Sequence, residues 1–390
     1  MALTLILILF LFFTAVPAVV GLINMVRALS FSRLIKQFAG ARSPSGISAL
    51  ATEGDPDPAS ADNAPLVSVL IPARNEENNI AACLESVSRQ SVRPIEILVL
   101  DDQSEDATAS VVEEMASKDN RIVLLKGRPL PDGWLGKNWA CHQLSQKALG
   151  RRLLFIDADV HLEPDALATM LKHQDDHPAD LLSLFPTQRM QTAGEWLVVP
   201  LMNWILLSFL PMELVYRSSD PSFVAANGQF MLFRAGAYRA LGGHESVRRE
   251  VVEDMALARI FKQNGKRVIT RPDGGVVSCR MYPGLRASLD GFTKNFFPGF
   301  NSTPFRFLMM LAVVFLLFTL PLFLLFHHQG FLLALVPIAL NRFFTSVASR
   351  QNPVINVLLH PLQMVFLVIV GIRSVRAAKQ GSIIWKDRRV

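Results

Sequence analysis

Cysteine is scarce in this chain of 390 residues, and its three cysteines, Cys83, Cys141 and Cys279, stand far apart. Because their number is odd and no CxxC pair occurs, the sequence predicts neither a disulfide framework nor a zinc site, and it fits a reducing compartment. Two phosphate-binding signatures are missing as well. There is no GxxxxGK[ST] loop, and no GxGxxG follows the first predicted strand, which disfavours a dinucleotide dehydrogenase.

Long basic runs are also absent, although the net charge is +6, from 39 Lys and Arg against 33 Asp and Glu. The basic residues lie beside apolar segments and do not alternate with aromatic ones. This pattern favours anionic lipid head groups as partners and disfavours nucleic acid. Apolar residues make up 51% of the chain, and the mean hydropathy is +0.31. Their excess lies at the two ends, as expected for membrane segments attached to a soluble middle.

Residues 1–26 are predicted to form a transmembrane anchor, because residues 2–25 are almost continuously apolar. A cleaved signal peptide is the alternative, since TAVPA resembles a cleavage site, but a basic n-region is missing and the apolar part is too long. Residues 27–65 then form a basic juxtamembrane segment and a flexible linker rich in Pro, Ser, Ala, Gly and Asp. The basic residues of this segment predict that the following domain lies in the cytoplasm; they are Arg27, Arg33, Lys36 and Arg42.

Residues 66–300 are predicted to form a soluble domain of the α/β class. Short apolar runs alternate in it with helical stretches. Strands that are apolar throughout and alternate with helices are typical of a parallel sheet covered on both faces. We expect strands at 67–73, 95–102, 122–127 and 152–157, and helices at 76–90, 106–118 and 138–149.

Residues 301–372 form a second membrane region with apolar stretches at 307–326, 331–347 and 354–372, and residues 373–390 form a basic tail. Three crossings would carry that tail outside, against the positive-inside tendency. Asn341 and Arg342 are costly in mid-bilayer, so one stretch is a candidate for a re-entrant or interfacial segment, and two to three spans are expected.

A further apolar stretch, residues 196–214, lies inside the soluble domain. It predicts either a buried core helix or an interfacial helix with Trp196 and Trp204 at head-group level, where it would help a lipid to enter.

Carboxylates end two of the predicted strands. Asp157 and Asp159 directly follow LLFI, and a pair of aspartates at a strand end suits Mg²⁺ or Mn²⁺ shared with substrate phosphates, although an isolated Asp-x-Asp usually marks a turn. Asp101 and Asp102 end the run LVL. Helix capping is one interpretation of this pair. The other is that one of them, foremost Asp102, hydrogen-bonds a base or ribose.

Two loops add candidate phosphate ligands. After the first strand, Pro72 is expected to end the strand, Asn75 to cap a helix and Glu76 to lie in its positive first turn. That leaves Arg74 to face a nucleotide or phosphate. Lys137 stands between a glycine turn and a helix start, a position that attracts phosphate.

Glu253 and Asp254 precede the helical pattern MALARIFKQNG. Acidic residues at a helix start are commonly partners of the helix dipole. The functional interpretation makes Asp254 a general base that takes a proton from an acceptor hydroxyl, with Glu253 as its catalytic neighbour.

Taken in order, five segments resemble the family 2 glycosyltransferases over roughly residues 66–270: VSVLIPARNEENNI, ILVLDDQSEDAT, GKNWA, FIDADV and VEDMALARIFKQNG. The resemblance implies a GT-A type fold, which is a nucleotide-binding, mostly parallel sheet with flanking helices, and a nucleotide-sugar donor of the UDP type. It also implies a metal role for Asp157 and Asp159, a nucleotide role for Asp101 or Asp102, and the base role for Asp254.

A narrower resemblance, to hopene-associated and carotenoid-glycosylating glycosyltransferases, rests on PLPDGWLGKNWACHQL, ANGQFMLFRAGAYRALGGHESV, SCRMYPGLRASLDGFTKNFFPG and IIWKDRR. It implies a polycyclic or isoprenoid lipid acceptor. Asn227 and Gly228 fall where the family lines the sugar pocket, and Gln229, Arg280 and Tyr282 are acceptor-side candidates. The alternatives are a plain turn at 227–229 and a head-group role for the arginine.

Two departures from family patterns bear on the expected reaction. Asp387 replaces the glycine of the common WKGR tail, which puts a role for the tail in doubt. SCRMYPG stands where processive synthases carry QxxRW, which favours transfer of a single sugar over polymer synthesis.

The expected protein is therefore a multi-pass, metal-dependent enzyme of the bacterial inner membrane that glycosylates a lipid with inversion at the cytoplasmic face. One alternative is a polyprenyl-phosphate sugar synthase, which needs less base assistance. An alternative of another class is a catalytically silent membrane scaffold or lipid-binding protein.

Overall fold

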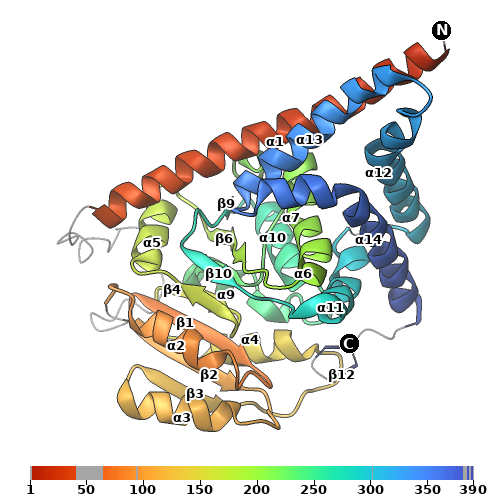
Figure 1. The fold of residues 1–390 in the computed structure, drawn as a ribbon. Coiled ribbons are helices and arrows are strands. Elements are labelled where there is room, and N and C mark those ends of the chain that lie inside the picture. The colour runs from red at the N-terminus through yellow and green to blue at the C-terminus, as the bar shows by residue number, and fades with distance from the viewer. Residues whose placement is uncertain are drawn as a thin grey trace.

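A seven-stranded sheet forms the centre of the molecule (Figure 1). The computed structural model describes residues 2–40, 65–93, 95–300, 302–380, 384–385 and 388–389. The strand order is β3-β2-β1-β4-β8-β6-β9, and all neighbours are parallel except β8, which is antiparallel to β4 and β6. The strands are β1 (Val67–Ala73), β2 (Ile95–Asp101), β3 (Ile122–Lys126), β4 (Arg152–Ile156), β6 (Leu181–Phe185), β8 (Phe230–Arg234) and β9 (Val268–Pro272).

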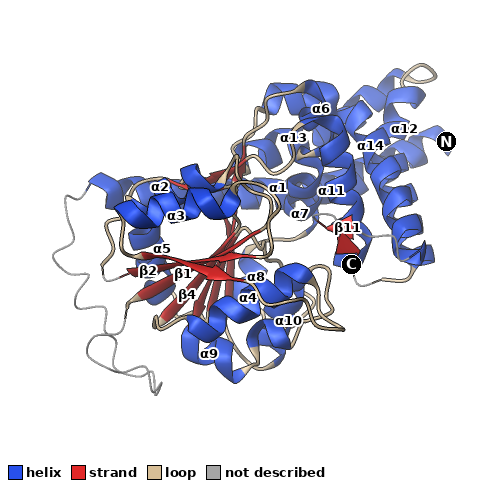
Figure 2. Cartoon of the chain, turned by 90° about the horizontal axis from the view of Figure 1, so that it is seen from below, coloured by secondary structure: helices blue, strands red, loops and turns tan. Residues whose placement is uncertain are grey.

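Helices cover both faces of this sheet, with α2 and α3 on one side and α4, α9 and α10 on the other (Figure 2). The sequence of β1 is apolar throughout because the strand is buried on both faces. Val69 and Ile71 pack in one core with α2, and Leu70 packs in the other with α4. The helices are α2 (Ile80–Ser88), α3 (Thr108–Lys118), α4 (Gly136–Lys147), α5 (Ala166–Asp176), α9 (Ala235–Ala240) and α10 (Glu253–Gln263). The predicted α/β class is confirmed.

The first predicted strand and helix differ from the structure at their junction. Pro72 does not end β1, because it lies inside the strand at a register position opposite Leu100. Asn75 does not cap a helix. Its φ is 52°, its Oδ1 accepts a hydrogen bond of 2.9 Å from the backbone N–H of Glu105, and α2 begins only at Ile80.

A small second sheet lies beside the carboxyl ends of the central strands. Its middle strand β10 (Val277–Cys279) pairs antiparallel with β5 (Val160–Leu162) and parallel with β7 (Thr187–Gln188). It thereby ties the segment after β4 to the segment that leads into the membrane region.

Among the described residues, four helices are long and apolar enough to cross a membrane: α1 (Ala2–Gly40), α12 (Pro304–Leu324), α13 (Leu332–Ala348) and α14 (Pro353–Gln380). Helix α1 continues well beyond the predicted anchor, so Arg27, Arg33 and Lys36 lie on the same helix as the apolar residues. The predicted linker falls outside the described residues, apart from its last residue. Helix α13 runs alongside α1 in Figure 1, where Asn341 Nδ2 donates a hydrogen bond of 2.8 Å to Pro17 O.

The apolar stretch at 196–214 forms α6 (Ala193–Val198), α7 (Pro200–Phe209) and the start of α8 (Glu213–Arg217). Trp204 is 1% exposed, and its Nε1 donates to Asn341 Oδ1 at 2.6 Å. The prediction that Trp204 lies at head-group level is therefore wrong, and the core-helix alternative is right for it. Asn341 and Arg342 avoid lipid in the same way, since both are buried and Arg342 bonds to Gln363.

Candidate active site

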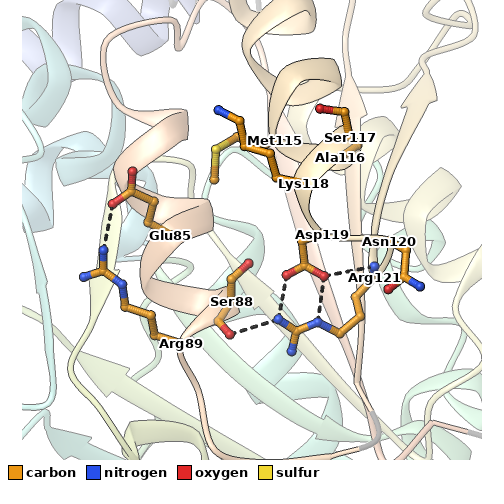
Figure 3. A pocket seen from close by; sticks show the side chains of 10 residues that line it. All are labelled: Glu85, Ser88, Arg89, Met115, Ala116, Ser117, Lys118, Asp119, Asn120 and Arg121. Carbon is orange, nitrogen blue, oxygen red and sulfur yellow. Dashed lines mark hydrogen bonds and ion pairs between the residues drawn. The ribbon is translucent and has the colours of Figure 1, made fainter.

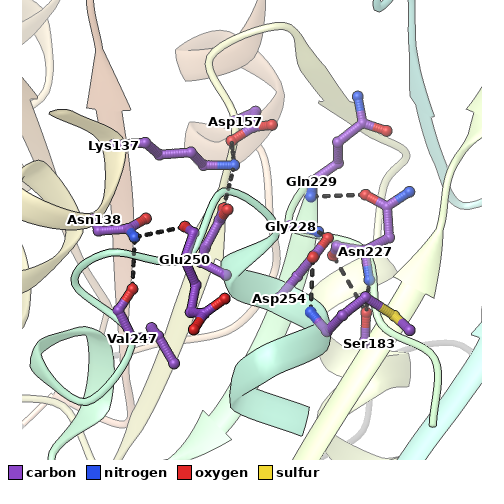
Figure 4. A network of polar contacts seen from close by, with 12 residues as sticks. Lys137, Asn138, Asp157, Ser183, Asn227, Gly228, Gln229, Val247, Glu250 and Asp254 are labelled. Carbon is purple, nitrogen blue, oxygen red and sulfur yellow. Dashed lines mark hydrogen bonds and ion pairs between the residues drawn. The ribbon is translucent and has the colours of Figure 1, made fainter. Parts of the chain in front are cut away.

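A group of four charged side chains lies where β4 ends and α4 and α10 begin: Lys137, Asp157, Glu253 and Asp254. Figure 4 labels all of them except Glu253. Lys137 Nζ lies 2.8 Å from Asp157 Oδ1 and 3.0 Å from Glu253 Oε1. Asn138 Nδ2 fixes this approach of α4 to α10, because it donates to Val247 O at 2.8 Å and to Glu250 O at 3.0 Å. The sequence thus brings together residues that are more than a hundred positions apart.

Lys137 and Glu253 are held in their charged forms. Burial would lower the pKa of Lys137, but the carboxylates of Asp157 and Glu253 outweigh it and keep that pKa well above its usual value. Burial would likewise raise the pKa of Glu253, but Lys137 keeps it below its usual value. The charged Lys137 therefore lies between the carboxylates of Asp157 and Glu253.

Asp254 differs from its neighbour because the charge of Lys137 lowers its pKa too little to outweigh the effect of burial. Its Oδ2 accepts a hydrogen bond of 2.7 Å from Gly228 N, and its Oδ1 accepts one of 2.7 Å from Met255 N. Burial, and then the charge of Glu253, raise the pKa of Asp254 to about 7. A carboxylate with such a pKa is well suited to take up a proton near neutral pH.

Gly228 is the point on which these side chains converge. A Cβ at this position would lie 2.9 Å from Lys137 Nζ, 3.2 Å from Glu253 Oε1 and 3.6 Å from Asp254 Oδ2. A side chain at Gly228 would therefore require the end of Lys137 and the Glu253 carboxylate to shift.

The turn that holds Gly228 is closed by side chains. Asn227 N donates to Ser183 Oγ at 2.8 Å, and Asn227 Oδ1 accepts from Gln229 N at 2.9 Å (Figure 4). The plain-turn alternative therefore explains these two groups of Asn227. Gln229 is 3% exposed and its Nε2 donates to Cys279 Sγ at 3.0 Å, which directs its amide toward β10.

Asp157 and Asp159 stand at the predicted metal position. Within the described residues, no group of three or more His, Cys, Asp and Glu side chains is arranged to hold a metal. Asp159 Oδ1 is nevertheless buried without a hydrogen-bond partner in that part of the chain. Burial, then Asp157 and Glu76, raise the pKa of Asp159 to about 7. Because Mg²⁺ commonly binds through one or two carboxylates and substrate phosphates, this pair fits a cation that arrives with a diphosphate.

Arg74 fastens the loop after β2 to the end of β1. It is 7% exposed and donates to Asp102 O at 2.8 Å and to Gln103 O at 2.7 Å. Asp101 Oδ1 accepts from Ser104 N at 3.2 Å, which is a contact within the loop and not a helix cap, because α3 begins only at Thr108. The two predicted nucleotide segments therefore lie together, with Asp102 buried between them.

Asp102 shares its surroundings with the charged cluster. Both influence the pKa of the buried Cys141 thiol. Burial raises this pKa, Lys137 opposes the rise, and the charges of Glu253, Asp157 and Asp102 add to it. Asp102 and Glu253 thus both lie within electrostatic range of the Cys141 thiol.

The acceptor-side candidates lie where α6 meets α11 (Gly284–Gly299). Arg280 Nη2 and Gly284 N both donate to Glu195 Oε1, each at 2.8 Å. Burial would raise the pKa of Glu195, but Arg280 and two backbone N–H groups lower it to about 2. Tyr282 packs against Phe292 at 5.3 Å, and burial followed by Asp159 and Asp157 raises the pKa of Tyr282.

Two functional candidates escaped the sequence prediction, Glu195 and Lys294. Burial lowers the pKa of Lys294 to about 8, and the charge of Glu253 opposes the change, so this lysine of α11 lies within electrostatic range of Glu253. Lys294 stands in the mainly apolar segment GFTKNFFPG, and Glu195 in AGEWLVVP. A lone charge in an apolar helix was the available signal.

A surface hollow between α2 and α3 contains none of the predicted site residues (Figure 3). Its Arg121 is bound to Asp119, with Nη2 at 2.6 Å from Oδ2, and to Ser88 O at 2.9 Å. This hollow is therefore separate from the candidate active site.

Comparisons with known proteins decide the family. The model of "Glycosyl transferase family 2" matches residues 68–242. The chain is 30% identical over 341 residues to the 4,4'-diaponeurosporenoate glycosyltransferase of Staphylococcus aureus (strain USA300), a match that spans 83% of this chain and 88% of that relative. The chain belongs to glycosyltransferase family 2. The predicted enzyme class is confirmed with it.

This family 2 glycosyltransferase is similar to further proteins. The Staphylococcus haemolyticus (strain JCSC1435) protein named 4,4'-diaponeurosporenoate glycosyltransferase is 29% identical over 251 residues, which span 63% of this chain and 65%, just under two thirds, of that relative. Two solved structures align at lower identity. The mannosyltransferase PcManGT from Pyrobaculum calidifontis in complex with GDP-Man and Mn2+ is 17% identical, with 93% of this chain and 98% of that chain covered and a TM-score of 0.49. S. aureus TarS 1-349 in complex with UDP is 16% identical, with 81% and 91% covered and a TM-score of 0.39.

Proposed function

We propose that this family 2 glycosyltransferase transfers a single sugar, with inversion, from a nucleotide-sugar of the UDP type to a hopanoid- or carotenoid-like isoprenoid lipid. The observation that carries the proposal is the convergence of Lys137, Glu253 and Asp254 on Gly228. Relatives named for a carotenoid acid and four apolar helices beside the domain support the lipid acceptor.

On the donor side, Asp157 and Asp159 are the residues that would hold Mg²⁺ or Mn²⁺ together with the diphosphate. The cation would neutralise charge that grows on the leaving diphosphate. Lys137 lies 2.8 Å from Asp157 and adds positive charge at the same place. The nucleotide side is lined by Pro72, Arg74, Glu76, Asp101 and Asp102, and the sugar side by Asn227 and Gly228.

Asp254 is the proposed base, because its pKa of about 7 lets it accept a proton that the acceptor hydroxyl loses. Glu253 is its catalytic neighbour: it binds Lys137 and its charge raises the proton affinity of Asp254. The hydroxyl then attacks the anomeric carbon from the face opposite the diphosphate, which inverts the configuration.

The acceptor side comprises Gln229, Arg280 and Tyr282. Helices α6 and α11, which frame Arg280, also pack against α14 through Phe297 and Gln363. This contact supports delivery of the acceptor from the bilayer. Basic residues next to the membrane helices would bind anionic lipid head groups, and their position at the end of α1 supports a cytoplasmic catalytic domain in a bacterial inner membrane.

The variant Asp254→Asn tests the base role in the purified full-length protein. Loss of a positioned base is expected to lower turnover by about 10²–10⁴ while the KM for the donor stays nearly unchanged. Asp220→Asn is the matched control, because Asp220 is exposed and bonds only locally to Ser222 within the described part of the chain. Wild-type turnover in Asp254→Asn would exclude Asp254 as the base.

A second candidate, transfer to an anionic acceptor such as a polyprenyl phosphate or a lipid carboxylate, is favoured by Lys294. An anionic acceptor carries no proton to remove, and a lysine near Glu253 would bind it. Under this alternative, Asp254→Asn has a mild effect and Lys294→Met raises the KM for the acceptor strongly. A catalytically silent scaffold would show no metal-dependent hydrolysis of any nucleotide-sugar.

A further inference from the structure

Helix α14 contacts the catalytic domain in its middle and near its end, and the turn that precedes it does so as well. Before its first turn, Arg350 Nη1 donates to Gly274 O at 3.3 Å, in the turn between β9 and β10. In its middle, Gln363 Nε2 donates to Trp196 O of α6 at 2.7 Å. Near its end, Ser374 Oγ accepts from Phe297 N of α11 at 2.9 Å. Both ends of α14 therefore lie on the side of the active site.

Helices α12 and α13 behave differently. The turn that joins them lies next to the beginning of α1, where the rings of Phe331 and Phe10 are 6.2 Å apart and Gly330 lies near Leu7. The start of α12 lies against α11, where Phe307 and Phe296 are 5.2 Å apart. Thus α12 leads away from the catalytic domain, and α13 returns to it at Arg350.

The length of α14 would suffice for a crossing, but its end is in the wrong place for one. The stretch from Pro353 to Arg373 measures about 30 Å at the helical rise, which equals the thickness of the hydrocarbon core. A crossing would put Arg373 at the far face of the membrane. Arg373 Nη2 instead lies 2.6 Å from Asp290 Oδ1 of α11.

The two faces of α14 differ in exposure. Apolar side chains are exposed on one face at a spacing of three and four residues, which makes a single helical stripe. The opposite face is buried against the protein and carries polar groups such as Asn356, Gln363 and Ser374 besides apolar ones such as Leu367 and Val370. The stripe consists of Val354, Leu358, Leu362, Val365, Ile369 and Ile372, with exposed fractions from 37% to 74%.

We propose that α14 does not cross the membrane but lies along the leaflet that faces the catalytic domain, with its apolar stripe against the acyl chains. The apolar stripe would face lipid in either arrangement, and the two ends of the helix, both on the side of the catalytic domain, favour the one along the surface. Helices α1, α12 and α13 then make three crossings, and Arg373, Arg376 and Lys379 lie on the catalytic side. This arrangement removes the conflict between three C-terminal spans and the positive-inside tendency. Figures 1 and 2 both draw the hairpin of β11 (Ile384–Trp385) and β12 (Arg388–Arg389) next to α11.

Single exposed cysteines in the full-length protein test this topology. The variants are Lys379→Cys at the end of α14, Gln329→Cys in the turn between α12 and α13, and Ser117→Cys on α3 as the catalytic-side reference. Each is treated with a membrane-impermeant maleimide in sealed vesicles of either orientation. The wild type serves as the blank, because Cys83, Cys141 and Cys279 are all buried.

The expected result is that Lys379→Cys and Ser117→Cys are labelled in the same vesicle orientation, and Gln329→Cys in the opposite one. Labelling of Lys379→Cys together with Gln329→Cys would overturn the proposal and make α14 a fourth crossing. Labelling of Lys379→Cys in neither orientation, or equally in both, would also overturn it, since the proposal places this residue in water on one defined side. None of these outcomes depends on sugar transfer.

Discussion

Ionisation of Asp159 and Asp254 destabilises the folded protein, and their proposed roles in metal binding and proton transfer would explain why they are buried. Burial raises the pKa of each to about 7, so near neutral pH both carboxyl groups are only partly ionised. Ionised carboxylates are needed for a cation and for proton uptake, yet the folded protein resists their ionisation. Sites of catalysis commonly show this tension between stability and function.

Asp159→Asn is expected to raise the midpoint of thermal unfolding at pH 8 in the absence of metal and nucleotide. A raised pKa means that stability is complete below the pKa of the unfolded chain and is lost as the pH rises through about 7, whereas asparagine has no charge to bury. The gain should therefore vanish near pH 4. Thermal unfolding of the purified protein from pH 4 to pH 8 measures it, with Asp220→Asn as control. A gain in the unfolding midpoint that grows toward low pH would contradict a raised pKa of Asp159.

Gly228→Ala tests the convergence of the cluster. The added methyl group would lie 2.9 Å from Lys137 Nζ and 3.2 Å from Glu253 Oε1, so this ion pair must shift. A displacement of about 1 Å at a reacting centre costs on the order of 10²-fold in rate, and we expect turnover to fall by up to that factor. Gly299→Ala is the matched control, because a Cβ there meets nothing within 4 Å. Equal turnover in both variants would show that the cluster tolerates a side chain.

Among the elements, α6 and α11 are joined by one carboxylate. Glu195 is 1% exposed and accepts from Arg280, from Gly284 N and, at 2.6 Å, from Gln191 N. Gly194 adds a close approach, since a Cβ there would lie 2.5 Å from Leu285 Cβ. Helices α6 and α11 therefore form a closely packed pair.

Glu195→Gln should destabilise the protein by about 1.5–3 kcal/mol, the usual contribution of a hydrogen bond to a charged group. The pKa of Glu195 is lowered to about 2, so its stabilisation is complete above the usual pKa of a glutamate and is lost as the pH falls toward 2. Chemical denaturation at pH 7 and pH 4 measures the effect, which should be larger at pH 7. Glu113→Gln, on the exposed side of α3, should change nothing. Equal stabilities of the two variants would show that Glu195 does not stabilise the contact between α6 and α11.

The sequence predicted the strands better than the start of the first helix. Strand β1 has the predicted bounds, 67–73, because an apolar run between turns leaves little choice of register. Helix α2 starts four residues later than predicted, because Asn75 bonds to the loop after β2, thirty positions away. Local capping rules do not contain that tertiary contact.

On the scale of the whole molecule, the sequence predicted the two membrane regions and the charged residues that the structure brings together at the ends of β4, α4 and α10. Asp157, Glu253 and Lys137 were found because each stands at the end of a predicted element, and the structure joins them. Glu195 and Lys294 were missed because they enter the site through α6 and α11, whose packing no local pattern specifies. The metal and substrate roles of the site residues remain predictions.

The most direct test of sugar transfer at this cluster is mass spectrometry of lipids from host cells that lack the gene and carry either the wild-type protein or Asp254→Asn. We predict a lipid with a hexose-sized mass increment when the wild type is present. It should be absent from the deletion strain and from cells with Asp254→Asn at equal protein level. Identical lipid profiles in all three strains would contradict the proposed transfer to a membrane lipid.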